Sequence, residues 1–142
     1  EGIVIPYASA HGNTKEAALF MAELLEKAGQ KVIPMDLNRE DMAKAVENAF
    51  RYDRMILAAI TYDGALFPAM EDFLYHLEIK NFQKRKVAII ENGSWGPMVA
   101  KVIIGLMEKS KDIEWSGTAT LMSALNSASE AQVESIAEAL SK

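Results

Sequence analysis

The chain has 142 residues, of which half are hydrophobic and a quarter are charged, and its mean hydropathy is +0.00. A chain of this length can bury about 70% of its unfolded surface, and the composition is typical of a globular protein rather than a disordered or fibrous one. We therefore expect one domain over residues 1–142. No apolar run approaches the roughly 18 residues that span a bilayer, and no signal peptide is recognisable, so we expect a cytoplasmic protein without membrane contact.

Charge and residue usage exclude several classes of chemistry. The net charge is −5, from 15 Lys and Arg against 20 Asp and Glu, which is the wrong sign for a protein that neutralises nucleic-acid phosphates. The absence of cysteine excludes disulfides, thiolate zinc sites, iron–sulfur clusters and thiol nucleophiles. Two histidines, His11 and His76, are too few for a histidine-rich metal site. Any redox or catalytic chemistry would therefore have to come from a bound cofactor.

The first elements show a strand pattern followed by a helical pattern. The apolar run Ile3–Ile5 predicts a strand, and apolar residues at helical spacing from Ala17 to Ala28 predict a helix. Asn13 is placed to cap this helix, and Gly29 is placed to end it in a left-handed conformation.

The next two strands differ in their expected position in a sheet. Val32–Met35 contains Pro34, which cannot donate a backbone hydrogen bond, so we expect an edge strand. Asn38 is then predicted to cap a helix with an apolar face from Met42 to Phe50. The uninterrupted apolar run Met55–Ile60 is typical of a strand covered on both faces, so we expect it to be central.

The remaining elements continue the alternation. We expect a helix from near Pro68, a strand over Lys86–Ile90, a helix with an apolar face from Val99 to Leu106, a strand over Ile113–Leu121, and a last helix that opens with a capping box at Ser127 and Glu130.

Strict alternation of five strands with five helices predicts an α/β fold. Right-handed crossovers then give a parallel sheet with helices on both faces, a three-layer doubly wound arrangement. An edge-like second strand and a central third strand suit the strand order 2-1-3-4-5. A ligand would then bind beyond the carboxyl ends of the first and third strands, where the strand order reverses.

The loop after the first strand has the composition of a phosphate site. Residues 9–14 read Ser-Ala-His-Gly-Asn-Thr and lead directly into the first predicted helix. Hydroxyls and backbone N–H groups at the positive end of a helix can hold a phosphate without a cationic side chain. The alternative is structural: Gly12 permits a tight turn, and Asn13 or Thr14 caps the helix.

Two further loops carry aromatic, hydroxyl and glycine residues at the same expected edge of the sheet. Residues 61–65 read Thr-Tyr-Asp-Gly-Ala and follow the third strand, while residues 92–97 read Asn-Gly-Ser-Trp-Gly-Pro and follow the fourth. Trp95 could serve as an aromatic platform for a ligand. The alternatives are an ordinary turn at Asp63 and Gly64 and a tryptophan folded over the end of the sheet.

Competing ligand classes can be tested on the same loops. A dinucleotide site would show G-x-G-x-x-G and a nucleoside triphosphatase G-x-x-x-x-G-K-[ST], and neither motif is present. A phosphorylated receiver domain would show acidic residues after the first strand and at the end of the third. The chain instead has Pro6–Ala8 and Ala59–Thr61 at those places.

The three loops together resemble those of flavodoxins and, more closely, of the A-type flavoprotein (flavodiiron) family. The resemblance rests on residues 7–14, on residues 61–68 with their Phe-Pro step, and on residues 92–96 with their tryptophan. It implies a flavodoxin-like fold that binds FMN. The implied phosphate-binding residues are Ser9, Ala10, His11, Gly12, Asn13 and Thr14. The residues implied to hold the isoalloxazine are Thr61, Tyr62, Asp63 and Gly64 on one side and Asn92, Gly93, Ser94 and Trp95 on the other.

The resemblance also implies a function in electron transfer. The domain would relay electrons to a redox partner, such as a rubredoxin-like protein or a reductase, or to a di-iron domain. The chain would act as a separate carrier or as the flavin domain, cut from a longer protein, of an oxidoreductase for oxygen or nitric oxide. His11, Asp63 and Ser94 depart from residues usual in the family, which keeps two alternatives open: an interaction or homodimerisation module that has lost FMN, and a small FMN-dependent quinone or flavin reductase.

Overall fold

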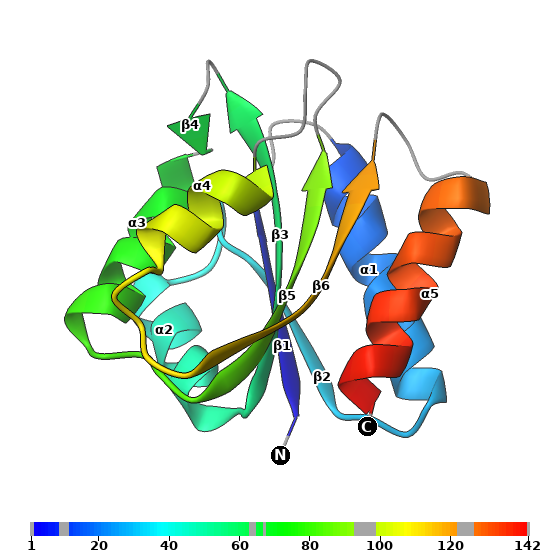
Figure 1. The fold of residues 1–142 in the computed structure, drawn as a ribbon, viewed down its shortest axis with the longest axis horizontal. Coiled ribbons are helices and arrows are strands. Elements are labelled where there is room, and N and C mark those ends of the chain that lie inside the picture. The colour runs from blue at the N-terminus through cyan, green and yellow to red at the C-terminus, as the bar shows by residue number, and fades with distance from the viewer. Residues whose placement is uncertain are drawn as a thin grey trace.

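The computed structural model describes residues 2–8, 12–62, 65–66, 68–92, 99–121 and 127–141 (Figure 1). The strands are β1 (Ile3–Ala8), β2 (Val32–Asp36), β3 (Arg54–Tyr62), β4 (Ala65–Leu66), β5 (Arg85–Asn92) and β6 (Ile113–Leu121). The helices are α1 (Gly12–Lys27), α2 (Met42–Arg51), α3 (Pro68–Ile79), α4 (Val99–Leu106) and α5 (Ser127–Ser141).

Five strands form a parallel sheet in the order β2-β1-β3-β5-β6, and the short β4 pairs antiparallel with β3. Helices α1 and α5 cover one face of the sheet, and α2, α3 and α4 cover the other (Figure 1). Counted over the five parallel strands, the order is 2-1-3-4-5. The prediction of a three-layer, doubly wound α/β fold is confirmed.

The position of each strand follows from its residues. All six residues of β1 are buried, and Met55–Ala59 of β3 are buried as well, as expected for strands between two helical layers. β2 lies at the edge of the sheet, where Pro34 is exposed, and only Met35 of this strand is buried. The proline and the apolar run therefore predicted the edge and the centre correctly.

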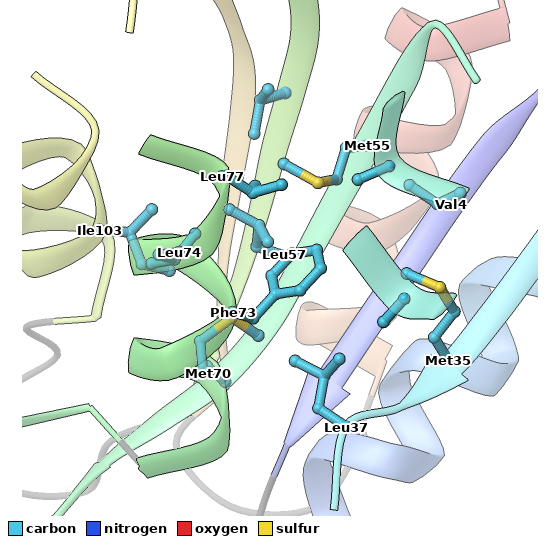
Figure 2. Packing of buried hydrophobic residues seen from close by; sticks show 14 of the residues in the cluster. Val4, Met35, Leu37, Met55, Leu57, Met70, Phe73, Leu74, Leu77 and Ile103 are labelled. Atoms are coloured by element: carbon cyan, nitrogen blue, oxygen red, sulfur yellow. The ribbon is translucent and has the colours of Figure 1, made fainter. Parts of the chain in front are cut away.

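Side chains alternate between two cores, one on each face of the sheet. On one face, Phe73 and Leu74 of α3 pack in the cluster that contains Leu57 of β3 (Figure 2). On the other face, Met21 of α1 lies in a second cluster with Ile56, the neighbour of Leu57 in β3. Burial on both faces fixes the register of the central strands, because a shift by one residue would exchange the two sets of side chains.

The ends of α1 agree with the sequence prediction at one end and differ at the other. Gly29 has φ +86°, and the N–H of Gln30 donates to the Leu25 carbonyl at 3.0 Å, so the helix ends in the left-handed motif that was expected. At the other end, the helix already begins at Gly12. Asn13 therefore lies inside the first turn, and its prediction as the cap is wrong.

Asn38 does not cap α2, because the residues before the helix form a turn of their own. The Asn38 N–H donates to Asp36 Oδ1 at 3.0 Å, and the Asp36 N–H donates to Glu40 Oε2 at 2.9 Å. The helix begins three residues after the turn residue Arg39, and Asp41 is its cap, with Oδ1 accepting from the Ala43 N–H at 3.3 Å. Both Asn and Asp are good caps, and the turn decides between them.

Candidate cofactor site

The ends of three neighbouring strands form the edge of the sheet at which the site was predicted. β1 ends at Ala8, β3 at Tyr62 and β5 at Asn92, and these strands are adjacent in the sheet. Ala8 pairs with Ala59, and Ile60 pairs with Asn92. All three ends lie at the upper edge in Figure 1. The fold therefore brings together the starts of the three predicted loops.

Thr14 is the predicted site residue whose side chain the structure describes at this edge. It lies in the first turn of α1, is 1% exposed, and its Oγ1 has no hydrogen-bond partner among the residues that the structure describes. A buried polar atom without a partner costs about 1–3 kcal/mol, so this hydroxyl requires an explanation. The first turn of α1 contains no acidic residue, and the helix dipole is positive at this end. A phosphate oxygen would accept the Thr14 O–H, and the residues present fit this group.

The second predicted segment is partly strand rather than loop. β3 continues through Thr61 and Tyr62, which pair with Leu66 and Ala65 of β4. The prediction of a loop at Thr61 and Tyr62 is therefore wrong. Two β-formers before an Asp-Gly pair are a hairpin signal, and this signal could have revealed β4 in advance.

The third segment begins inside β5, which ends at Asn92 rather than before it. The preceding residue, Glu91, was not identified from the sequence. Its side chain is buried at 6% exposure, and its Oε1 accepts a hydrogen bond from the Ala100 N–H in α4 at 2.9 Å. An acidic residue that continues an apolar strand run was the available signal, since a carboxylate is rarely buried without a partner.

The predicted residues differ in how far the structure describes them. Thr14 is described with its side chain. The backbone alone is described for Gly12, Asn13, Thr61, Tyr62 and Asn92. The residues that lie outside the described part of the chain are Ser9, Ala10, His11, Asp63, Gly64, Gly93, Ser94 and Trp95.

Tyr7 of β1 lies in an electrostatic environment made negative by Asp36 and Glu40. Its side chain is buried, and burial raises the pKa of its phenol above the ordinary value. The carboxylates of Asp36 and Glu40 raise that pKa further, and Arg39 opposes them. The Tyr7 carbonyl accepts from the Leu37 N–H at 2.9 Å. The phenol therefore stays protonated well above neutral pH.

The opposite edge of the sheet is held by arginine side chains. Arg85 donates from Nη2 to the Phe50 carbonyl at 3.0 Å and from Nε to the Tyr52 carbonyl at 3.1 Å. Arg54 Nη1 donates to the Leu140 carbonyl of α5. These cations satisfy carbonyls at the ends of two helices, so we assign them to stability rather than to the site.

A comparison with protein families decides the family. Residues 4–112 match the family model described as a flavodoxin domain. The chain belongs to the flavodoxin-domain family. No curated protein matches it, so the further comparisons of this flavodoxin domain are with solved structures.

Those structures show the same fold at low sequence identity. A flavodoxin from Streptococcus pneumoniae TIGR4 is 23% identical with a TM-score of 0.83, and the match covers 99% of this chain and 97% of that chain. Flavodoxin 2 from Bacillus cereus is 25% identical with a TM-score of 0.79, covering 98% and 97%. The rubredoxin oxygen:oxidoreductase from Desulfovibrio gigas is 16% identical with a TM-score of 0.90. The match covers 99% of this flavodoxin domain and 35% of that longer chain.

Within the described ranges, the flavodoxin domain contains neither a helix long and apolar enough to cross a membrane nor a group of three acidic or histidine side chains that could hold a metal ion.

Proposed function

We propose that this flavodoxin domain binds FMN and carries electrons. The observation that carries the proposal is Thr14 in the first turn of α1, at the carboxyl edge of the sheet, whose buried hydroxyl lacks a partner within the described ranges. β1 lies between β2 and β3, so this is also the point at which the strand order reverses and at which doubly wound sheets bind ligands.

The chain's own residues would orient the cofactor. Thr14 would donate its O–H to the phosphate, and the N–H groups at the start of α1 would face the same dianion. The ends of β3 and β5 would flank the ring, with Tyr62 and Asn92 at the two strand ends. FMN would supply the redox chemistry, since its ring accepts electrons that no side chain of this chain can accept.

We further propose that the electron partner is a di-iron domain or a small redox protein of the rubredoxin class. Three observations support this finer assignment. The three loop sequences resemble those of A-type flavoproteins, and the fold superimposes on the rubredoxin oxygen:oxidoreductase with a TM-score of 0.90. A flavodiiron core from Synechocystis also matches, with a TM-score of 0.83 at 14% identity.

Parallel titrations of the apoprotein with FMN and riboflavin test the proposal. Both ligands carry the same ring, and only FMN carries the phosphate that Thr14 and α1 would hold. We expect a micromolar or tighter dissociation constant for FMN and at least a hundredfold weaker one for riboflavin. Equal affinities would refute the phosphate site, and absence of binding by both ligands would refute the proposed function.

A further inference from the structure

Helix α4 is apolar along most of its length but is only partly buried. Lys101 is the single charged residue in Val99–Leu106. The buried side of the helix is given by Ile103, which is directed toward Leu74 of α3 (Figure 2). Ile104 is nevertheless 42% exposed, although a surface helix normally presents polar residues to the solvent. The outer face of α4 therefore carries apolar surface that the described part of the chain leaves uncovered.

The centre of this outer face is a stripe of four residues at positions i, i+3, i+4 and i+7. They are Lys101, Ile104, Gly105 and Glu108. All four are exposed, and residues at this spacing lie on one side of a helix. Glu108 belongs to the turn that continues α4, because the Met107 N–H still donates to the Ile103 carbonyl at 3.0 Å. We call these four residues the α4 stripe.

The two charges of the α4 stripe are placed against the dipole of their own helix. Lys101 lies in the first turn, where the dipole is positive, and Glu108 follows the last turn, where it is negative. Neither residue forms an ion pair with another residue of the described ranges. An antiparallel helix from another molecule would reverse this unfavourable placement, because each charge would then lie beside the favourable end of the neighbouring helix.

Gly105 has no packing reason within the chain. A glycine inside a helix destabilises it relative to alanine, and a Cβ at Gly105 would meet no atom of another element within 4 Å in the described structure. Space inside the chain therefore does not require a glycine at this position. Close approach of a second backbone does, since glycine leaves no side chain in the way.

We propose that the α4 stripe is an interface at which a second copy of this chain binds, with the two α4 helices antiparallel about a two-fold axis. Such an interface uses the same surface on both copies. An axis between Ile104 and Gly105 places Lys101 opposite Glu108 of the partner subunit and Ile104 opposite Gly105 of the partner subunit. Each charge then meets its opposite, and each bulky side chain meets a position without one. This complementarity of the stripe with itself selects a second copy as the occupant, and it does not rest on FMN binding.

Sedimentation equilibrium of the whole chain, from micromolar to about millimolar concentration, tests the proposal. One helix from each copy makes a small interface, so we expect a dimer with a high micromolar dissociation constant. Lys101→Glu replaces both attractive pairs with repulsive ones and should weaken dimerisation about tenfold or more. Lys44→Glu is the matched control, because Lys44 is exposed on α2 and its reversal changes the net charge equally. This control should stay within about threefold of the unchanged chain.

Two further variants test the geometry of the pair. The double variant Lys101→Glu/Glu108→Lys restores opposite charges across the interface, so it should dimerise at least about threefold more tightly than Lys101→Glu alone. Gly105→Leu fills the space opposite Ile104 of the partner subunit and should abolish dimerisation without loss of stability in urea, because leucine favours the helix more than glycine does.

Four results would each overturn the proposal. They are an unchanged chain that stays monomeric at about 1 mM, a Lys101→Glu variant that dimerises as well as Lys44→Glu, a double variant no tighter than Lys101→Glu, and a Gly105→Leu variant that dimerises like the unchanged chain.

Discussion

Replacing Thr14 with valine should move stability and FMN affinity in opposite directions. The two side chains have nearly the same shape, so the substitution exchanges Oγ1 for a methyl group. In the apoprotein this hydroxyl is buried without a partner in the part of the chain that the structure describes, at a cost of about 1–3 kcal/mol, and Thr14→Val should raise the free energy of unfolding by an amount in that range. In the complex the same change removes a hydrogen bond to a charged group, worth about 1.5–3 kcal/mol, which corresponds to roughly 10- to 150-fold weaker binding.

Urea unfolding of the apoprotein and a fluorescence titration with FMN measure the two effects separately. Thr118→Val serves as the control, because Thr118 is exposed on β6 and surface substitutions of this kind change stability by about 0.5 kcal/mol or less. If Thr14→Val destabilises the apoprotein, the hydroxyl has a partner in the fold. If it also leaves the FMN dissociation constant unchanged, Thr14 is not part of the phosphate site.

Three further predictions concern the stability of the fold. Arg85→Ala removes hydrogen bonds to two carbonyls at the end of α2 and should cost about 1–3 kcal/mol in urea unfolding with no change in FMN affinity; a loss of affinity would contradict the assignment to stability. Burial, together with the charges of Asp36 and Glu40, raises the pKa of Tyr7 in the folded protein. The protonated phenol therefore contributes its full stability below about pH 10, and this contribution is lost as the pH rises through the folded pKa. As the pH rises above about 10, the thermal unfolding temperature should fall more steeply for the unchanged chain than for Tyr7→Phe. Equal slopes of unfolding temperature against pH would refute this. Gly117 has φ +143°, and a Cβ there would lie 3.2 Å from Ile136 Cγ1, so Gly117→Ala should cost about 1–3 kcal/mol, and a neutral result would show that the strand relaxes.

The fold could be predicted because the burial of a strand determines the pattern of apolar residues in its sequence. The apolar run Met55–Ile60 required two covering layers, and Pro34 required an edge, and together they selected the strand order that the structure shows. Local hydrogen bonding was harder to predict. Asn38 and Asp41 are equally suitable caps, and the choice depends on the turn that Asp36 and Glu40 form.

For the site, the sequence predicted only the edge of the sheet at which it lies. The starts of the loops are placed by strand order, so the sequence could bring Ala8, Tyr62 and Asn92 together. The burial of Thr14 without a partner and the Glu91–Ala100 hydrogen bond depend on the packing of helices against the sheet. Such contacts join residues through the tertiary structure, and the sequence marks at most one partner, as the acidic residue at the end of the apolar run marks Glu91 but not Ala100.

The absorption spectrum of the purified protein tests the central claim most directly. We predict flavin absorption in the visible blue that stays with the protein through desalting, either as isolated or after incubation with excess FMN. A protein that remains colourless after that incubation, while still folded by circular dichroism, would contradict the account.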